Sequence, residues 1–275
     1  MTILQALILG LVQGLTEYIP VSSTAHLILV PWLLGWQFDP QTVFVFNILV
    51  QWGTLAGVVA YFWRDIWAIA TGVLGGLRRR QPFDTPEARL GWFVVMATLP
   101  AVVVGFFLKP IMEQLYQLYT LIAGVMMLAG VLMLAAEHWG KRRRALSSMT
   151  ALDAFIIGAW QVLAFIPGVS RSSATVSGGL LRHFERADAA RFSFLMSIPA
   201  LLGAGVIALT DLLDNPQLVA ALAGPLAAGF LAALISGYVS IRWLLGYLKT
   251  RSFNAFIIYR LIFGALCILI GLTRG

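Results

Sequence analysis

Long apolar runs separated by short polar segments dominate the hydrophobic pattern of this chain. Five runs carry no charged residue and are long enough, at roughly 20 residues, for an α-helix to cross a bilayer. A sixth is interrupted only by Arg260. The predicted spans are 42–63, 90–108, 114–136, 192–210, 215–241 and 252–273. We therefore expect an all-α integral membrane protein with six transmembrane helices.

Two further apolar regions are broken by polar residues and turn formers. Region 1–36 breaks at "EYIP" (17–20), and region 154–181 breaks at Pro167-Gly168 and Arg171. Proline removes a backbone donor and disfavours helix at the residue before it. Each remaining piece is too short to span a bilayer comfortably. We expect each region to form a re-entrant helix-loop-helix hairpin.

The two halves of the chain resemble each other at an offset of 148 positions, which shrinks to 140 where "YTLIAG" (119–124) matches "YRLIFG" (259–264). The matched positions are Gln13 and Gln161, Ser22 and Ser170, Phe46 and Phe194, and "AGVVA" (56–60) and "AGVIA" (204–208). Each half would hold one hairpin and three spans, so the second half must lie inverted relative to the first. We expect one membrane domain over 1–275, with inverted repeats at about 1–140 and 150–275.

Composition supports a membrane protein and gives its orientation. The chain is 60% hydrophobic and only 11% charged, whereas soluble domains carry about 25% charged residues. The net charge of +7 would suggest nucleic acid as a partner of a soluble protein. Here the basic residues form short runs beside apolar spans, at 78–80 and 141–144. Such runs are typical of loops that face anionic lipid, so we expect no nucleic acid.

The predicted threading separates basic residues between the two sides of the membrane. One side receives the connections 64–90, 137–153, 182–191 and 242–251, which hold most of the arginines. The other side receives only Lys109 and Arg274. By the positive-inside rule the crowded side is cytoplasmic. Both termini and the mouth of the first hairpin are then expected to be extracytoplasmic. The single cysteine, Cys267, excludes internal disulfides.

The first break gathers chemically active side chains. They are Gln13, Glu17, Ser22, Ser23, Thr24 and His26. Gln13 and Glu17 lie four residues apart and share one helix face. The hydroxyl residues can cap the outgoing helix, whose N-terminus suits an anion. A carboxylate at membrane depth is costly and usually functional.

The second break repeats this arrangement with an arginine. Its polar residues are Ser170, Arg171, Ser172, Ser173 and Thr175, directly after Pro167-Gly168. A guanidinium offers a rigid fork of donors that matches phosphate oxygens. Opposed breaks in an inverted repeat meet near the midplane, so both clusters are expected to form one phosphate-handling site. Taken singly, the serines are explained by helix packing, His26 by packing, and Glu17 with Arg171 by a structural ion pair.

At these residues the chain resembles the undecaprenyl-diphosphatases, the bacitracin-resistance type of membrane phosphatase. "QGLTEYIPVSSTAH" (13–26) and "PGVSRSSAT" (167–175) are similar to the two signatures of that family, and the likeness extends along the whole chain. The resemblance implies hydrolysis of undecaprenyl diphosphate to undecaprenyl phosphate and inorganic phosphate, assisted by a divalent cation such as Mg²⁺ or Ca²⁺. It also implies the bacterial cytoplasmic (inner) membrane, where this reaction recycles the lipid carrier of cell-wall synthesis.

The resemblance assigns roles by position. Glu17, Ser23, His26 and Arg171 match catalytic residues, and Ser22, Thr24, Ser170, Ser172 and Thr175 match phosphate-lining positions. Gln13 stands where many members have Glu, and Ala25 where many have Gly. Gln13 can offer an amide oxygen beside Glu17 to a metal but adds no second negative charge. A mechanism that needs two ionised carboxylates on the metal is therefore not favoured.

Several alternatives stay open at this point. Ser23 could attack the terminal phosphorus with Glu17 as base and His26 as proton shuttle or leaving-group acid. Otherwise His26 is the nucleophile and Ser23 binds phosphate, or water attacks directly. A secondary transporter or flippase for a phosphate-bearing ligand has the same architecture, and a lipid-binding scaffold is a third class. The expected partners are a polyprenyl diphosphate and membrane lipids, with a homodimer as one open oligomeric state.

Overall fold

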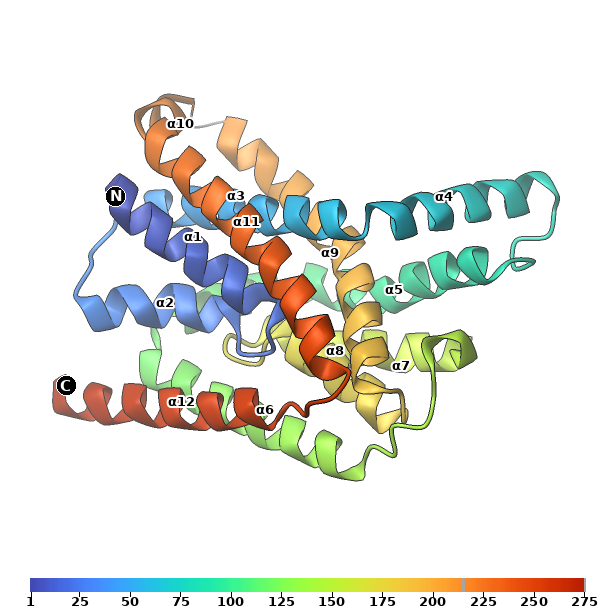
Figure 1. The fold of residues 1–275 in the computed structure, drawn as a ribbon. Helices are drawn as coiled ribbons and strands as arrows, with labels where there is room; N and C mark the ends of the chain where they lie inside the picture. Colours follow the sequence, from blue (N-terminus) through green and yellow to red (C-terminus); the bar gives the residue numbers. More distant parts are fainter. Residues whose placement is uncertain (214–215, 275) are drawn as a thin grey trace.

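A computed structural model describes residues 1–213 and 216–274, without the side chains of 106, 108–114, 116 and 207–213. The described chain is helical and contains no strand (Figure 1). The α-helices are α1 (Ile3–Tyr18), α2 (Ser23–Leu34), α3 (Pro40–Tyr61), α4 (Trp63–Arg78), α5 (Pro86–Glu113), α6 (Tyr119–Trp139), α7 (Ala151–Gln161), α8 (Arg171–Leu181), α9 (Arg186–Leu213), α10 (Pro216–Ala221), α11 (Ala223–Leu248) and α12 (Asn254–Arg274). Short 3-10 helices are η1 (Gln114–Gln117), η2 (Leu146–Ser148) and η3 (Val162–Phe165).

Six helices within the described residues are long and apolar enough to cross a membrane. They are α3, α5 over Pro86–Gly105, α6, α9 over Arg186–Val206, α11 and α12. This confirms the all-α class and the presence of six helices that could span a membrane. Both chain termini lie at one end of the bundle, and the turn after α4 lies at the opposite end (Figure 1). The side chain of Lys109, expected on the side of the termini, lies outside the described residues.

The segment 64–90, which links two of the predicted spans, contains α4, which packs against α5. One predicted helix boundary was wrong. The predicted span 215–241 is instead the short α10 followed by α11, which continues to Leu248. Charge-free runs mark hydrocarbon depth, whereas helices extend into the interfacial region where charged residues are tolerated. Arg89, Glu137, Arg191 and Arg242 accordingly lie inside helices α5, α6, α9 and α11.

Two breaks in the helices occur where the proline motifs predict them. α1 ends at Tyr18, and α2 begins after Ser22, whose φ of 76° is left-handed. The second break lies between η3 and α8, and its capping residue Ser170 has a φ of 75°. Left-handed backbone is uncommon for residues other than glycine and clusters at functional sites. Both breaks thus have a capping serine with a positive φ.

Gly168 closes the second break against α6. Its φ is +104°, and a Cβ there would lie 2.6 Å from the carbonyl oxygen of Ile122. Both the backbone conformation and the close approach require glycine. The break is therefore seated directly on the α6 backbone.

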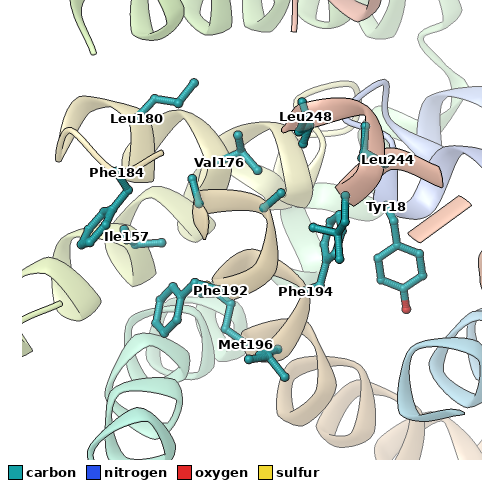
Figure 2. Close-up of a cluster of buried hydrophobic side chains, with 14 of the residues drawn as sticks. Tyr18, Ile157, Val176, Leu180, Phe184, Phe192, Phe194, Met196, Leu244 and Leu248 are labelled. Carbon is teal, nitrogen blue, oxygen red and sulfur yellow. The ribbon is translucent and has the colours of Figure 1, made fainter. Parts of the chain in front are cut away.

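The largest apolar cluster holds the two breaks in place (Figure 2). It joins Tyr18 at the end of α1 to Val176 of α8, Phe194 of α9 and Leu244 of α11. The rings of Tyr18 and Phe194 meet edge to face with centroids 5.2 Å apart. Because Tyr18 directly follows Glu17, this packing positions the end of α1 relative to α8 and α9.

The helices pack in matched pairs. α1 packs on α11 and α7 packs on α5, while α3 contacts α9 and α6 contacts α12. α1 also packs against α2, and α7 against α8. Two buried carboxylates each bind two arginines: Asp153 pairs with Arg144 and Arg182, and Glu137 pairs with Arg142 and Arg186. Part of the basic run at 141–144 is therefore bound by buried carboxylates.

Candidate active site

Glu17 lies at the centre of the polar cluster, in the last turn of α1. Its Oε2 accepts hydrogen bonds from Gln13 Nε2 at 2.9 Å and from Ser23 Oγ at 2.6 Å. The Gln13 contact follows from the four-residue spacing along α1. Ser23 reaches back because the break reverses the chain and Ser23 is the first residue of α2. One carboxylate thus binds both an amide and a hydroxyl.

Arg171 approaches the same carboxylate from the second break. It is the first residue of α8, and its Nη2 donates to Glu17 Oε1 at 2.7 Å. The two side chains are only 15% and 8% exposed. Ser172 Oγ also donates to the backbone oxygen of Glu17 at 3.2 Å. The structure therefore brings together Glu17, Ser23 and Arg171 from the two breaks.

Two buried polar atoms of this cluster have no hydrogen-bond partner. They are Arg171 Nη1 and Gln13 Oε1. Buried polar groups in native proteins are normally paired, and an unpaired one often marks the place of a ligand. An anion would satisfy the guanidinium N–H, and a cation or a donor would satisfy the amide oxygen. The site therefore offers complementary atoms to an anion with an associated cation.

Helix N-termini add further donors. Ser22 Oγ and Ser170 Oγ each accept only the third backbone N–H of the helix they cap, at 3.3 Å in both cases. The N–H groups of residues 23–24 and 171–172 have no acceptor inside their helices. The positive ends of two helix dipoles lie at these groups, which favours a negatively charged ligand.

His26 faces away from the carboxylate. Its Nδ1 lies 2.7 Å from the carbonyl oxygen of Ser22, and its Nε2 lies 2.6 Å from the hydroxyl of Tyr259. A carbonyl only accepts, so Nδ1 carries the proton and Nε2 accepts from Tyr259. Within the described residues no hydrogen bond joins His26 to Ser23 or Glu17. Tyr259 was missed by sequence reasoning because a tyrosine in an apolar span carries no charge signal.

The remaining predicted residues lie at different depths. Ser170 Oγ and Ser172 Oγ are 3.1 Å apart beside the cluster, and Thr24 is partly exposed in the first turn of α2. Thr175, predicted to bind substrate, is fully buried and turned away from Glu17. Its hydroxyl bonds to the backbone oxygen of Arg171 at 2.8 Å and to Ser193 at 2.6 Å. Its position fits support of α8 rather than contact with a ligand.

A metal site made only of protein ligands is absent from the described residues. They contain no group of three His, Cys, Asp or Glu side chains placed to hold an ion. Glu17 provides the one carboxylate of the cluster, and Gln13 Oε1 provides an unpaired oxygen. Mg²⁺ is commonly held by one or two carboxylates together with phosphate oxygens of a substrate. The donor set therefore fits a cation that arrives with a phosphate-bearing ligand.

Comparison with known proteins identifies the family. The family model described as bacitracin resistance protein BacA matches residues 6–266. An undecaprenyl-diphosphatase of Myxococcus xanthus is 43% identical over 270 residues, covering 98% of this chain and 89% of the relative. One from Pelobacter propionicus is 42% identical over 274 residues, covering 99% and 98%. Since the match extends over nearly the whole chain, this membrane protein belongs to the family of the bacitracin resistance protein BacA.

Proposed function

We propose that this chain is an undecaprenyl-diphosphatase, which hydrolyses undecaprenyl diphosphate to undecaprenyl phosphate and inorganic phosphate. The printed names of the full-length relatives support this activity. The observation that carries it is the Glu17 carboxylate, bound at once by the Ser23 hydroxyl and the Arg171 guanidinium. Base, nucleophile and phosphate clamp are then adjacent, as phosphoryl transfer requires. The relatives' names do not favour a transporter.

Ser23 is the proposed nucleophile. Its Oγ forms a bond to the terminal phosphorus while the bond from that phosphorus to the bridging oxygen breaks, releasing undecaprenyl phosphate. The Ser23 proton passes to Glu17 Oε2, with which it is already hydrogen-bonded at 2.6 Å. Water then attacks the phosphorus of the phosphoserine and the bond from phosphorus to Ser23 Oγ breaks. Ser23 Oγ recovers its proton from Glu17, and inorganic phosphate leaves with both protons of the attacking water. His26 is less well placed to attack, because both ring nitrogens are bound elsewhere.

Arg171 and the two helix N-termini form the proposed phosphate clamp. The free Nη1 of Arg171 donates to a phosphate oxygen while Nη2 stays on Glu17. The backbone N–H groups at the starts of α2 and α8 take further oxygens. Such donors are fixed before the reaction and stabilise the charge that develops during transfer, which commonly contributes a factor of 10²–10³ in kcat for one donor.

A divalent cation, Mg²⁺ or Ca²⁺, is the proposed cofactor. Glu17 and Gln13 Oε1 would hold it together with diphosphate oxygens. When bound, such an ion neutralises negative charge on the diphosphate and polarises its phosphoryl oxygens. With one carboxylate only, this site binds the ion in company with its substrate rather than beforehand.

The membrane arrangement is also part of the proposal. α1 with α2, and α7 with α8, form re-entrant hairpins, supported by their short lengths and by the breaks between them. An inverted repeat is supported by the paired packing of α1 on α11 and α7 on α5. The positive-inside rule favours an orientation in which the basic segments lie on the cytoplasmic side of the membrane and the site opens to the extracytoplasmic side. The prenyl tail then enters from lipid and the diphosphate from a polar chamber.

Phosphate release by the purified protein tests the function. In detergent no gradient exists, so release of inorganic phosphate from undecaprenyl diphosphate separates an enzyme from a transporter. We expect release by the wild-type protein, loss in Ser23→Ala, and dependence on divalent cation when a chelator is added. Absence of release from a folded, monodisperse wild-type preparation supplied with Mg²⁺ and Ca²⁺ would refute the proposal.

A further inference from the structure

Arg260 is the largest fully buried side chain of the described chain, and it lies in the first third of α12. It donates Nη1 to the carbonyl oxygen of Pro20 at 3.0 Å. Its Nη2 donates to the carbonyl oxygens of Gly168 at 2.9 Å and Val169 at 3.0 Å. Its Nε donates to Met126 of α6 at 3.0 Å. One guanidinium thus binds both helix breaks at once.

The partners of Arg260 are unusual for a buried charge. Among the described ion pairs none includes Arg260, and its four acceptors are all backbone carbonyls. Pro20, Gly168 and Val169 lie between helices, and no backbone N–H in the described chain donates to their oxygens. Non-helical backbone at membrane depth must be satisfied within the protein. Arg260 does this for the two breaks together.

The bound carbonyls lie next to the catalytic cluster in both breaks. Pro20 lies between Glu17 and Ser23 along the chain, and Gly168 and Val169 directly precede Ser170 and Arg171. The guanidinium is planar and its donors form a fixed fork. It therefore fixes the distance between the carbonyl oxygen of Pro20 and those of Gly168 and Val169, and with it the distance between the first and second breaks.

We propose that Arg260 is a positioning residue that holds the two breaks at the separation at which Arg171 reaches Glu17 and a bound diphosphate. The effect of Arg260 on the reaction rate rests on the proposed function. Its effect on the binding of an anion between the two breaks does not. Misplacement of catalytic groups by about 1 Å can cost on the order of 10² in rate. Loss of the hydrogen bonds from Arg260 to the two breaks is expected to lower kcat while the fold persists, since α12 still packs on α6.

The first test replaces Arg260 by lysine and uses Arg274 as a matched control. Arg274 also lies on α12 and donates to backbone carbonyls, those of Trp32 and Leu33, away from the breaks. We expect Arg260→Lys to be monodisperse in detergent with kcat at least tenfold below wild type and with a raised KM, because the displaced breaks also bind the diphosphate less well. Arg274→Lys should keep wild-type kcat. A folded Arg260→Lys protein with wild-type kcat would overturn the inference.

A second variant pair displaces Arg260 without removing its charge. A Cβ at Gly130 of α6 would lie 3.4 Å from Arg260 Cβ and 3.6 Å from its Nε, which is ordinary contact. Gly130→Ala is therefore tolerated, whereas the additional methyl groups of Gly130→Val push against the guanidinium. We expect Gly130→Val, but not Gly130→Ala, to lower kcat at least tenfold. A wild-type kcat in both folded Gly130 variants would contradict the positioning role of Arg260, even if Arg260→Lys does not fold.

A binding measurement separates this inference from the proposed function. Thermal unfolding in detergent is followed with and without inorganic pyrophosphate as the probe. We expect pyrophosphate to raise the midpoint of wild-type and Gly130→Ala protein and to have little effect on Gly130→Val. If wild type releases no phosphate but shows this pattern, the proposed function is wrong and the positioning role of Arg260 is supported. If Gly130→Val responds to pyrophosphate as wild type does, the positioning role of Arg260 is wrong.

Discussion

Arg171 Nη2 lies 2.7 Å from Glu17 Oε1, although 154 positions separate the two residues in the chain. Each stands at the edge of a helix break, and each break is capped by a serine with a positive φ. The pair therefore joins two segments that the sequence places in different halves. The remaining N–H of Arg171 at Nη1 is buried and unpaired, so Arg171 can accept a further partner while it stays paired with Glu17.

Removing the guanidinium of Arg171 should nearly abolish turnover. Arg171→Lys keeps the positive charge beside Glu17 but lacks the second donor for phosphate, and we expect kcat to fall by about 10²-fold. Arg171→Ala should lose more. Steady-state phosphate release, with size-exclusion profiles to establish folding, measures both variants. Substantial activity in Arg171→Ala would exclude the phosphate clamp.

Trapping the phosphorylated enzyme identifies the nucleophile. Since Ser23 Oγ is hydrogen-bonded to Glu17 and His26 is not, we expect labelled substrate, quenched rapidly in denaturing detergent at neutral pH so that both phosphoserine and phosphohistidine survive, to leave the label on Ser23. Peptide mapping of the quenched protein reads the position. Label on His26 would reverse the assignment, and a label on neither residue under conditions of turnover would favour direct attack by water.

Tyr259 should matter less than Glu17 or Ser23. Tyr259→Phe leaves His26 Nε2 without its donor but leaves the contacts of Ser23 and Glu17 intact. We expect a decrease in kcat of less than about tenfold, as for loss of one neutral hydrogen bond of about 1 kcal/mol. His26→Gln, measured beside it, reports the whole contribution of the imidazole. A loss in Tyr259→Phe as large as in Ser23→Ala would place the tyrosine in the reaction itself.

Gln13→Glu should change the cation requirement. The substitution puts a second carboxylate beside Glu17, where Gln13 now offers an unpaired amide oxygen. A second negative oxygen favours Mg²⁺ directly, so we expect the Mg²⁺ concentration for half-maximal rate to fall by about tenfold. Titration of activity against free Mg²⁺ measures this. An unchanged titration would mean that position 13 does not contact the ion.

The free energy of unfolding should depend on Asp153, which pairs with Arg144 and Arg182. Burial alone would raise the pKa of this carboxyl, but hydrogen bonds from Arg144, Thr150 and Arg182 together lower it well below its usual value. The unfolded carboxyl titrates near about 3.9. Its ionised form therefore stabilises the fold fully above that pH, and this contribution is lost as the pH falls through it toward the lower folded-state pKa.

Asp153→Asn is the corresponding variant. We expect it to lower the free energy of unfolding at pH 7 by about 2 kcal/mol, since two partly buried arginines lose their partner. The difference from wild type should shrink below about pH 4. Asp84→Asn, in the more exposed pair with Arg79, is the control and should cost under about 1 kcal/mol. Equal effects of the two substitutions in thermal unfolding would contradict the account.

Sequence patterns predicted the parts of the site that follow from local chemistry. Pro20 and Pro167-Gly168 marked the breaks, and a charge at membrane depth marked Glu17 and Arg171. Arg260 carried the same charge signal, but its role could not be read because its partners are backbone carbonyls, which no residue type encodes. The hydrogen bond from the Thr175 hydroxyl to the backbone oxygen of Arg171 could not be predicted either, because its acceptor is also a backbone carbonyl.

The most direct test of the shared site is an experimental structure with a non-hydrolysable undecaprenyl diphosphate analogue in lipid nanodiscs. We predict the diphosphate between the two breaks, with Arg171 Nη1 within hydrogen-bond distance of a phosphate oxygen and Ser23 Oγ about 3–3.5 Å from the terminal phosphorus. A diphosphate bound elsewhere, or Arg171 separated from Glu17 with no common chamber, would contradict the account.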